Sequence, residues 1–174
     1  MPDYKYSFQG FDAEHMARCV GKDLPISTKH SIEICKFLKG KSLEKAKYLL
    51  VEISEKKQAL KFTRFNKGVG HKPGIGPGRY PVKACKAIHH LLGSVEGNAV
   101  YKGMDGDNLI IKHIACHQAS RPMKQSRRTR GESKRTHVEI VVEESVTKKP
   151  KEQDKKNKTE NKKVKSETKS EDKK

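Results

Sequence analysis

Apolar residues recur at helical spacing in three parts of the chain. The expected helices cover residues 28–39, 43–53 and 81–103. Ser27 and Ser42 stand at the N-cap positions of the first two helices, where a hydroxyl side chain is favoured. Pro81 takes the first position of the third helix, where its missing N–H is not needed.

Three shorter segments alternate between apolar and polar residues, which is the period of a half-buried strand. They are residues 4–8, 109–116 and 137–142. The last is the clearest, because Val138, Ile140 and Val142 share one face and Glu139 lies on the other. Three helices packed on a small antiparallel sheet predict an α+β fold.

A cationic segment with almost nothing to bury, residues 119–136, separates the last two expected strands. It carries seven cations against one acid, and it holds five of the eight arginines of the chain. The loop of an ordinary β-hairpin takes about 2–5 residues, so this segment is far too long for a turn. With its two halves extended, it would project about 30 Å beyond the sheet as a long protruding β-hairpin.

Such a hairpin needs support from outside the chain, because a bare two-stranded ribbon is only marginally stable in water. Guanidinium groups match phosphate oxygens and stack on exposed bases, so the segment indicates an RNA partner. The alternative is a disordered basic linker, for example a nuclear localisation patch. The flanking strands argue against that alternative, since they bring the two ends of the segment together.

The charge of the whole chain also favours a polyanionic partner. Its 39 Lys and Arg residues against 21 Asp and Glu residues give a formal charge of +18, which points to a nucleic acid or an anionic surface. Residues 147–174 hold twelve lysines, six acids and a single aliphatic residue. They bury too little to offset the entropy of ordering and are expected to be a disordered tail. Residues 1–146 then make one domain of ordinary size.

The chain is expected in the cytoplasm. No apolar run approaches the roughly 20 residues that a membrane helix needs, and the first residues lack the apolar stretch of a signal peptide. The four cysteines form no Cys-x-x-Cys pair and suit a reducing compartment. Cys35 and Cys85 fall on apolar helix faces, so core packing explains them.

Residues 66–79 form a glycine-rich segment that holds five of the thirteen glycines. A nucleotide-binding loop would need a preceding strand and a Gly-Lys-Ser/Thr or Gly-x-Gly-x-x-Gly frame, and neither frame is present. One interpretation is a flexible surface loop. The interpretation that we favour is a close approach of the glycine backbone to RNA, with nearby cations on phosphates.

No constellation for catalysis or metal binding stands out. His113, Cys116 and His117 have the composition of a metal cluster, but on a strand His113 and Cys116 face opposite sides. Satisfied or RNA-facing histidines are the better interpretation. The acids are expected on solvated helix faces, and no Cys–His pair has an oriented third group. We therefore expect neither an enzyme nor a site for a metal or cofactor.

Several motifs, in order along the chain, carry a resemblance to one family. They are residues 27–29 (STK), 33–34 (EI), 62–66 (FTRFN), 70–72 (GHK), 78–84 (GRYPVKA), 98–103 (NAVYKG) and 136–140 (THVEI). Over roughly residues 4–144, the sequence resembles the universal large-subunit ribosomal protein twenty-two (bacterial numbering; seventeen in eukaryotes). The compact glycine-rich segment and His71 are similar to the archaeal form.

The resemblance implies a structural constituent of the large ribosomal subunit, which binds and cross-braces large-subunit rRNA and contributes to subunit assembly. It also implies that a β-hairpin, here residues 115–137, extends toward the wall of the nascent polypeptide exit tunnel. Neighbouring ribosomal proteins near the tunnel exit, and the nascent polypeptide at the hairpin tip, would be further partners.

By position, the resemblance also implies which residues contact RNA. On the hairpin they would be Arg121, Lys124, Arg127, Arg128, Arg130, Lys134 and Arg135. On the body they would be Ser27, Lys29, Arg64, Lys67, His71, Lys72, Arg79, Lys83 and Asn98.

The hairpin tip departs from the family pattern. Residues 126–131 read SRRTRG where Pro-Arg-Ala and Gly-Arg would be expected, and the segment is several residues short. This departure bears on how far the tip reaches into the tunnel and not on rRNA binding.

Two rival functions follow from the residues taken without the resemblance. A free-standing nucleic-acid chaperone or DNA-compacting protein would self-associate and bind arbitrary duplex, whereas a ribosomal protein would sediment with large subunits. A metal- or nucleotide-dependent enzyme is the second rival, and metal assay and nucleotide titration would detect it.

Overall fold

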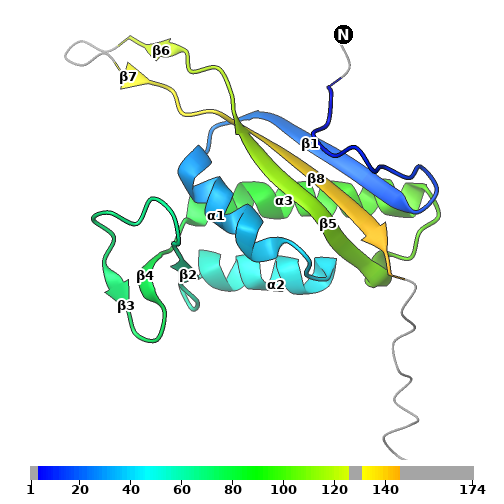
Figure 1. Ribbon diagram of the computed structural model, residues 1–174, viewed down its shortest axis with the longest axis horizontal. Coiled ribbons are helices and arrows are strands. Elements are labelled where there is room, and N and C mark those ends of the chain that lie inside the picture. The colour runs from blue at the N-terminus through cyan, green and yellow to red at the C-terminus, as the bar shows by residue number, and fades with distance from the viewer. Residues whose placement is uncertain (1–3, 126–130, 146–174) are drawn as a thin grey trace, which may run out of the picture.

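The computed structural model describes residues 4–125 and 131–145, which form a three-stranded antiparallel sheet backed by helices (Figure 1). The sheet has the order β1-β8-β5, with β1 at Met16–Leu24, β5 at Leu109–Gln118 and β8 at Thr136–Glu144. The last strand of the chain therefore lies in the middle of the sheet. The expected α+β fold is confirmed, while the tail predicted at residues 147–174 lies outside the described residues.

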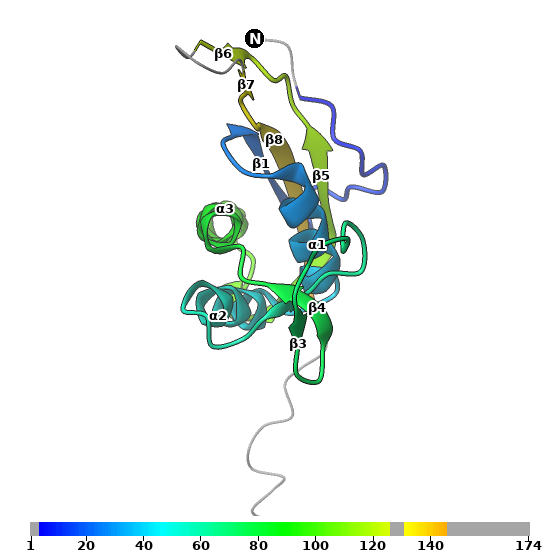
Figure 2. The same ribbon diagram turned by 90° about the vertical axis from the view of Figure 1, so that its left-hand side faces the viewer.

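The three expected helices are confirmed to within about two residues at each end. They are α1 at Thr28–Leu38, α2 at Leu43–Ser54 and α3 at Val82–Tyr101. Helix α1 packs on β5, α3 packs on β1, and α2 packs on α3, so the helices cover one face of the sheet (Figure 2). The core between them includes Val138, Ile140 and Val142 of β8, as their alternation predicted.

Strand β1 was not predicted, and the strand expected at residues 4–8 is irregular chain instead. Three core-side positions of β1 hold the small residues Ala17, Cys19 and Gly21, which give hardly any hydrophobic alternation. They are small because α3 packs closely on this strand. A Cβ added at Gly21 would lie 2.7 Å from the Cδ1 of Leu91.

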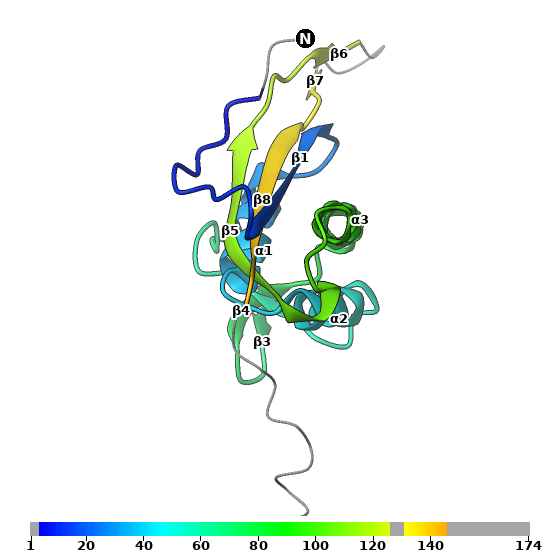
Figure 3. The ribbon, with the colours of Figure 1, turned by 90° about the vertical axis from the view of Figure 1, so that its right-hand side faces the viewer.

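The chain before β1 crosses the face of the sheet that the helices leave open, and we call residues 4–15 the N-terminal strap (Figure 3). Ser7 donates from both its backbone N–H, at 3.1 Å, and its hydroxyl to the Glu139 carboxylate. The Nε2 atoms of His113 and His117 lie 3.2 and 3.3 Å from the same carboxylate. Glu139 is fully buried, so these histidines are satisfied within the protein.

The glycine-rich segment is not a simple loop, because parts of it form a second small sheet. Its strands are β2 at Leu60–Lys61, β3 at His71–Lys72 and β4 at Gly76–Arg79, in the order β2-β4-β3. At Gly78, a Cβ would lie 3.1 Å from the Cγ of Lys72 and 3.4 Å from the carbonyl oxygen of Leu60. A glycine therefore suits the close approach of the three strands at this point.

The chain leaves the main sheet as a narrow ribbon beyond β5 and β8 (Figure 1). Ala119 N–H donates to the carbonyl of Arg135 at 3.2 Å, and Ser133 N–H donates to the carbonyl of Pro122 at 2.9 Å. The ribbon continues as β6 at Met123–Lys124, which pairs with β7 at Gly131–Glu132. The protruding hairpin is thus present in its described part, and residues 126–130 at its tip lie outside the description.

Candidate nucleic-acid interface

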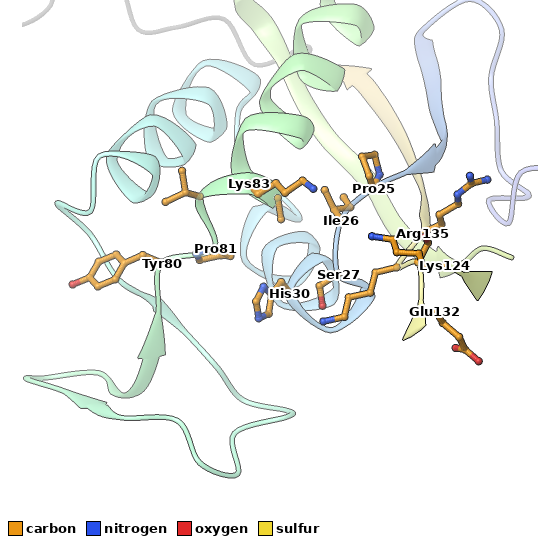
Figure 4. A pocket seen from close by; sticks show the side chains of 14 residues that line it. Pro25, Ile26, Ser27, His30, Tyr80, Pro81, Lys83, Lys124, Glu132 and Arg135 are labelled. Atoms are coloured by element: carbon orange, nitrogen blue, oxygen red, sulfur yellow. The ribbon is translucent and has the colours of Figure 1, made fainter. Parts of the chain in front are cut away.

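A concave surface lies where the hairpin base, the first turns of α1 and α3, and the second sheet come together, and we call it the basic groove. Figure 4 shows one of the two hollows that form it. The basic groove consists of two hollows of about 740 and 600 Å³, which share Ser27, His30 and Lys134 in their walls. The described lining carries one acid, Glu132. Its cations are Lys29, Lys67, Arg79, Lys83, Lys124, Lys134 and Arg135.

Two helices begin at the basic groove. Ser27 and Pro81 are the N-cap residues of α1 and α3, and neither helix receives a capping hydrogen bond from a side chain in the described chain. The first N–H groups of a helix lack partners within the helix, and the helix dipole adds partial positive charge there. The positive ends of both helices and the seven cations therefore make the groove a favourable place for an anion such as a phosphate.

The hairpin base is fixed to the start of α1 by buried hydroxyl groups. Thr136 is fully buried, and its hydroxyl donates to the carbonyl of Ile26 at 3.1 Å. The hydroxyl of Thr28 lies 2.9 Å from that of Thr136. Because Ile26 lines the basic groove, these bonds hold the hairpin cations at a set position relative to α1.

Glu33 of α1 holds the loop after β2 in place. Its carboxylate accepts from the backbone N–H of Arg64 at 2.7 Å and from the N–H and hydroxyl of Thr63 at 3.2 and 3.1 Å. The expectation that the helix acids are solvated is therefore wrong here, because Glu33 is only 2% exposed. A buried carboxylate is stable in this position because backbone donors replace its water.

The loop presents Phe65 to solvent beside two cations. Its ring is 41% exposed, and its backbone takes a φ of +54°, which is uncommon outside glycine. The Nζ of Lys29 lies 5.4 Å and the Cζ of Arg64 5.6 Å from the ring centre. An unpaired base can stack on an exposed ring of this kind, while the neighbouring cations bind the phosphates of the same strand. Sequence reasoning missed Phe65, although it stands within the FTRFN motif.

His30 was also missed, and it lies where the two hollows meet. Its ring packs edge-on against Phe62, with 5.6 Å between the ring centres. Burial lowers the pKa of His30, and the positive charges of Arg79 and Lys134 lower it further. The ring is therefore largely neutral at pH 7 in the free protein and available to either donate or accept a hydrogen bond.

Eight of the sixteen predicted RNA-contacting residues line the basic groove: Ser27 and the seven cations named above. Arg64 stands beside Phe65, at the edge of that groove. His71 and Lys72 lie on β3 in the second sheet, where the Nζ of Lys72 is 5.3 Å above the ring of Tyr80.

Two other predicted residues lie elsewhere. Arg121 is on the hairpin, with its guanidinium 3.8 Å from the Glu132 carboxylate. Asn98 is near the far end of α3, about 22 Å from Lys83 along the helix axis, and its Nδ2 donates to the carbonyl of Arg18 at 3.0 Å. Arg127, Arg128 and Arg130 fall outside the described residues.

Among residues 4–125 and 131–145, no group of three or more His, Cys, Asp or Glu side chains could hold a metal ion. None of the helices in these two stretches has the length and apolar character needed to span a membrane.

A basic groove beside a cationic hairpin, on a sheet covered by helices, is the arrangement of a small RNA-binding α+β domain. The chain belongs to the family described as ribosomal protein L22p/L17e, whose model matches residues 19–143. The resemblance drawn from the motifs is thereby confirmed. The family consists of ribosomal proteins rather than enzymes, which agrees with the expected lack of catalysis.

Relatives match most of the chain. The large ribosomal subunit protein uL22 of Thermofilum pendens is 38% identical over 150 residues, which cover 83% of this chain and 99% of the relative. The protein of the same name from Methanoculleus marisnigri is 42% identical over 141 residues, covering 76% and 92%. That of Cenarchaeum symbiosum is 39% identical over 152 residues, covering 83% and 100%. The similarity is therefore to the archaeal form of the family.

Proposed function

We propose that this chain is a structural constituent of the large subunit of the cytoplasmic ribosome and that it cross-braces large-subunit rRNA through the basic groove and the hairpin. Family membership and the large-subunit relatives support the first part. The second part rests on one observation, the convergence on a single groove of eight residues that the resemblance had implied by position. By holding RNA segments together, the protein contributes to assembly of the subunit.

In this proposal, phosphates occupy the basic groove and an unpaired base stacks on Phe65. Lys83 at the start of α3 and Lys134 at the hairpin base approach the same space from two elements. The buried Thr136 hydroxyl fixes the hairpin to α1, and α1 shares the hydrophobic core with α3, so the three elements meet the RNA as one rigid surface. RNA strands that contact α3 and the hairpin are therefore held at a fixed separation, which is what cross-bracing requires.

We extend the proposal to the hairpin, which runs toward the wall of the nascent polypeptide exit tunnel. The described ribbon carries Arg121 and Lys124, and the sequence continues with Arg127, Arg128 and Arg130. Residues Gly131 and Glu132, like Met123 and Lys124, are exposed in the free protein, so this ribbon lacks a core and gains its support from rRNA. Neighbouring ribosomal proteins near the tunnel exit, and the nascent polypeptide at the tip, are the further proposed partners.

Neutralising two cations of the basic groove tests the proposal. Each phosphate contact contributes about −0.9 on duplex, or about −0.7 on single strands, to the slope of log affinity against log salt. The double variant Arg79→Gln with Lys134→Gln should therefore flatten the slope for purified large-subunit rRNA by roughly 1.4 to 1.8. It should also sediment less with large subunits in a sucrose gradient of lysate.

The matched control is Lys45→Gln with Lys86→Gln, which removes two exposed lysines from α2 and α3 outside the basic groove. Equal salt slopes and equal sedimentation for the two double variants would overturn the groove assignment.

A second experiment addresses the hairpin and the rival function. Alanine at Arg127, Arg128 and Arg130 should lower incorporation into large subunits and flatten the salt slope. A free-standing DNA-compacting protein would bind random duplex DNA as tightly as rRNA of equal length, so a competition between the two ligands distinguishes the functions. Unchanged incorporation of the triple variant would contradict the hairpin part of the proposal.

A further inference from the structure

A second hollow lies at the far end of α3 from the basic groove. It has a volume of about 310 Å³ and is lined by Phe11, Arg18, Asn98, Tyr101 and Lys102. Along the axis of α3, Tyr101 lies about 27 Å from Lys83 of the basic groove. We call this hollow the Arg18 site.

The guanidinium of Arg18 is held in place without using its hydrogen-bond donors. Its Cζ lies 4.6 Å from the ring centre of Tyr6 and 4.5 Å from that of Phe11, so two aromatic rings of the strap pack against it. Arg18 is exposed, and within residues 4–125 and 131–145 its side chain makes no hydrogen bond or ion pair. A fixed guanidinium with five free donors matches the oxygens of a phosphate.

Tyr101 supplies an aromatic ring at the rim of the same hollow. Its side chain is 93% exposed, which is exceptional for a large hydrophobic residue. The ring contributes almost nothing to the core, so packing does not explain it. An aromatic ring next to a presented cation is the combination that binds single-stranded nucleic acid, with bases on rings and phosphates on cations.

Two further residues build the walls of the Arg18 site and are not free to bind. The Nζ of Lys102 donates to the carbonyls of Ala13 and Met16 at 3.0 and 2.8 Å, and it lies 5.0 Å from the ring centre of Phe11. Asn98 Nδ2 donates to the Arg18 carbonyl. Because these bonds tie the strap, β1 and α3 together, the site is formed before any ligand arrives.

We propose that the Arg18 site binds one unpaired nucleotide of RNA, with its phosphate on Arg18 and its base stacked on Tyr101. The inference rests on the proposed function, since the nucleotide belongs to the RNA that the protein braces. A protein partner is less well matched, because Phe11 is already flanked by two cations, and among the residues that line the hollow only Tyr101 presents an exposed aromatic ring. Occupation of both sites ties RNA segments that lie about 27 Å apart along α3.

The test uses the full-length chain and purified large-subunit rRNA. Tyr101→Ala should lower affinity about tenfold, within the range for loss of one stacked base, and leave the salt slope unchanged. Tyr101→Phe keeps the ring and should bind as the wild type. Arg18→Gln should also weaken binding, and it should flatten the salt slope by roughly 0.7, the value for one contact on single-stranded RNA.

The matched control is Tyr48→Ala, which removes a tyrosine that is 63% exposed on α2, outside the Arg18 site. Thermal unfolding by circular dichroism should show that Tyr101→Ala and Tyr48→Ala are equally stable. Equal rRNA affinity of these two variants would overturn the proposal. If the Arg79 and Lys134 variant still lost binding, the proposed function would stand without the second site.

Crosslinking gives an independent readout. With rRNA transcribed to contain 4-thiouridine, ultraviolet light should link RNA to the peptide that contains Tyr101 as well as to peptides of the basic groove. Links in the groove alone would overturn the Arg18 site. A crosslink from position 101 to a protein in assembled subunits, in place of RNA, would assign this surface to a protein partner and overturn it as well.

Discussion

The hydroxyl oxygens of Thr28 and Thr136 lie 2.9 Å apart and join the first turn of α1 to the base of the hairpin. Thr136 also donates to the Ile26 carbonyl, and it is completely buried. Water therefore cannot readily replace the buried bond to the Ile26 carbonyl when it is broken. This one contact couples the stability of the fold to the position of the hairpin.

Replacing Thr136 with valine keeps the shape of the side chain and removes its hydroxyl. We expect a loss of about 1–3 kcal/mol in the free energy of unfolding, because the Ile26 carbonyl loses its buried donor. Urea unfolding followed by circular dichroism measures the change. Thr136→Ser retains the hydroxyl and should cost less, so equal destabilisation by valine and serine would contradict the role given to these bonds.

Glu33→Ala should destabilise the protein by about 2–3 kcal/mol, since it removes the buried carboxylate that accepts charge-assisted hydrogen bonds from Thr63 and Arg64. It should also weaken rRNA binding, because the loop that presents Phe65 loses its anchor. Glu44→Ala, which removes an exposed acid of α2, serves as the control and should change neither quantity. If a destabilised Glu33 variant still bound rRNA tightly, the loop that presents Phe65 would not contribute to RNA binding, and the prediction would be wrong.

The pKa of His30 predicts two opposite pH effects. In the free protein, burial and then the charges of Arg79 and Lys134 lower this pKa, so the unfolded chain binds the proton more tightly than the folded state. Stability is therefore lost as the pH falls below the ordinary value of about 6.5 and through the folded pKa. Phosphates in the basic groove would reverse the local charge, so rRNA affinity should rise as the pH falls through the same window.

An NMR titration of the His30 ring, with and without RNA, measures both effects. The pKa should be low in the free protein and should rise in the complex. His30→Gln should abolish the rise in rRNA affinity that protonation of this ring causes at low pH. A His30 pKa that stays the same on binding would show that no phosphate approaches it.

Two glycines should respond to alanine in opposite ways. At Gly21 the added Cβ would lie 2.7 Å from Leu91 Cδ1, and overpacking of this kind costs roughly 1–3 kcal/mol. At Gly97, an exposed position within α3, the added Cβ meets nothing within 4 Å, so alanine should stabilise the helix by about 0.5–1 kcal/mol. Thermal unfolding of the two variants checks the signs, and a destabilised Gly97→Ala would contradict the helix argument.

Periodicity in the sequence predicted the helices and the strands β5 and β8, because each has a run of large apolar residues. It failed for β1, whose core positions hold small residues. It also failed for the N-terminal strap, where alternating aromatic residues suggested a strand. The strap is held by Ser7 on Glu139, a pair 132 positions apart, and no local pattern reveals a bond of that kind.

The sequence predicted many of the residues of the candidate interface, but it did not predict how they are arranged in space. Motif positions supplied eight of the cations and polar residues that the basic groove brings together. His30 and Phe65 were missed because neither stands out in the sequence as a cation. Arg18 was missed for another reason: two aromatic rings of the strap hold its guanidinium, and the sequence predicted a strand at residues 4–8 instead of this packing.

The central position of β8 has a consequence for how the protein is made. Both β1 and β5 pair with β8, so neither finds its partner until residues 136–144 have been synthesised. The pairing of β1 with β8 joins segments far apart in the sequence and is therefore intrinsically slow, and a strand that waits for its partner is prone to aggregate. The newly made chain is therefore expected to need an escort until β8 joins the sheet. A nascent chain stopped before residue 136 should form no main sheet at all.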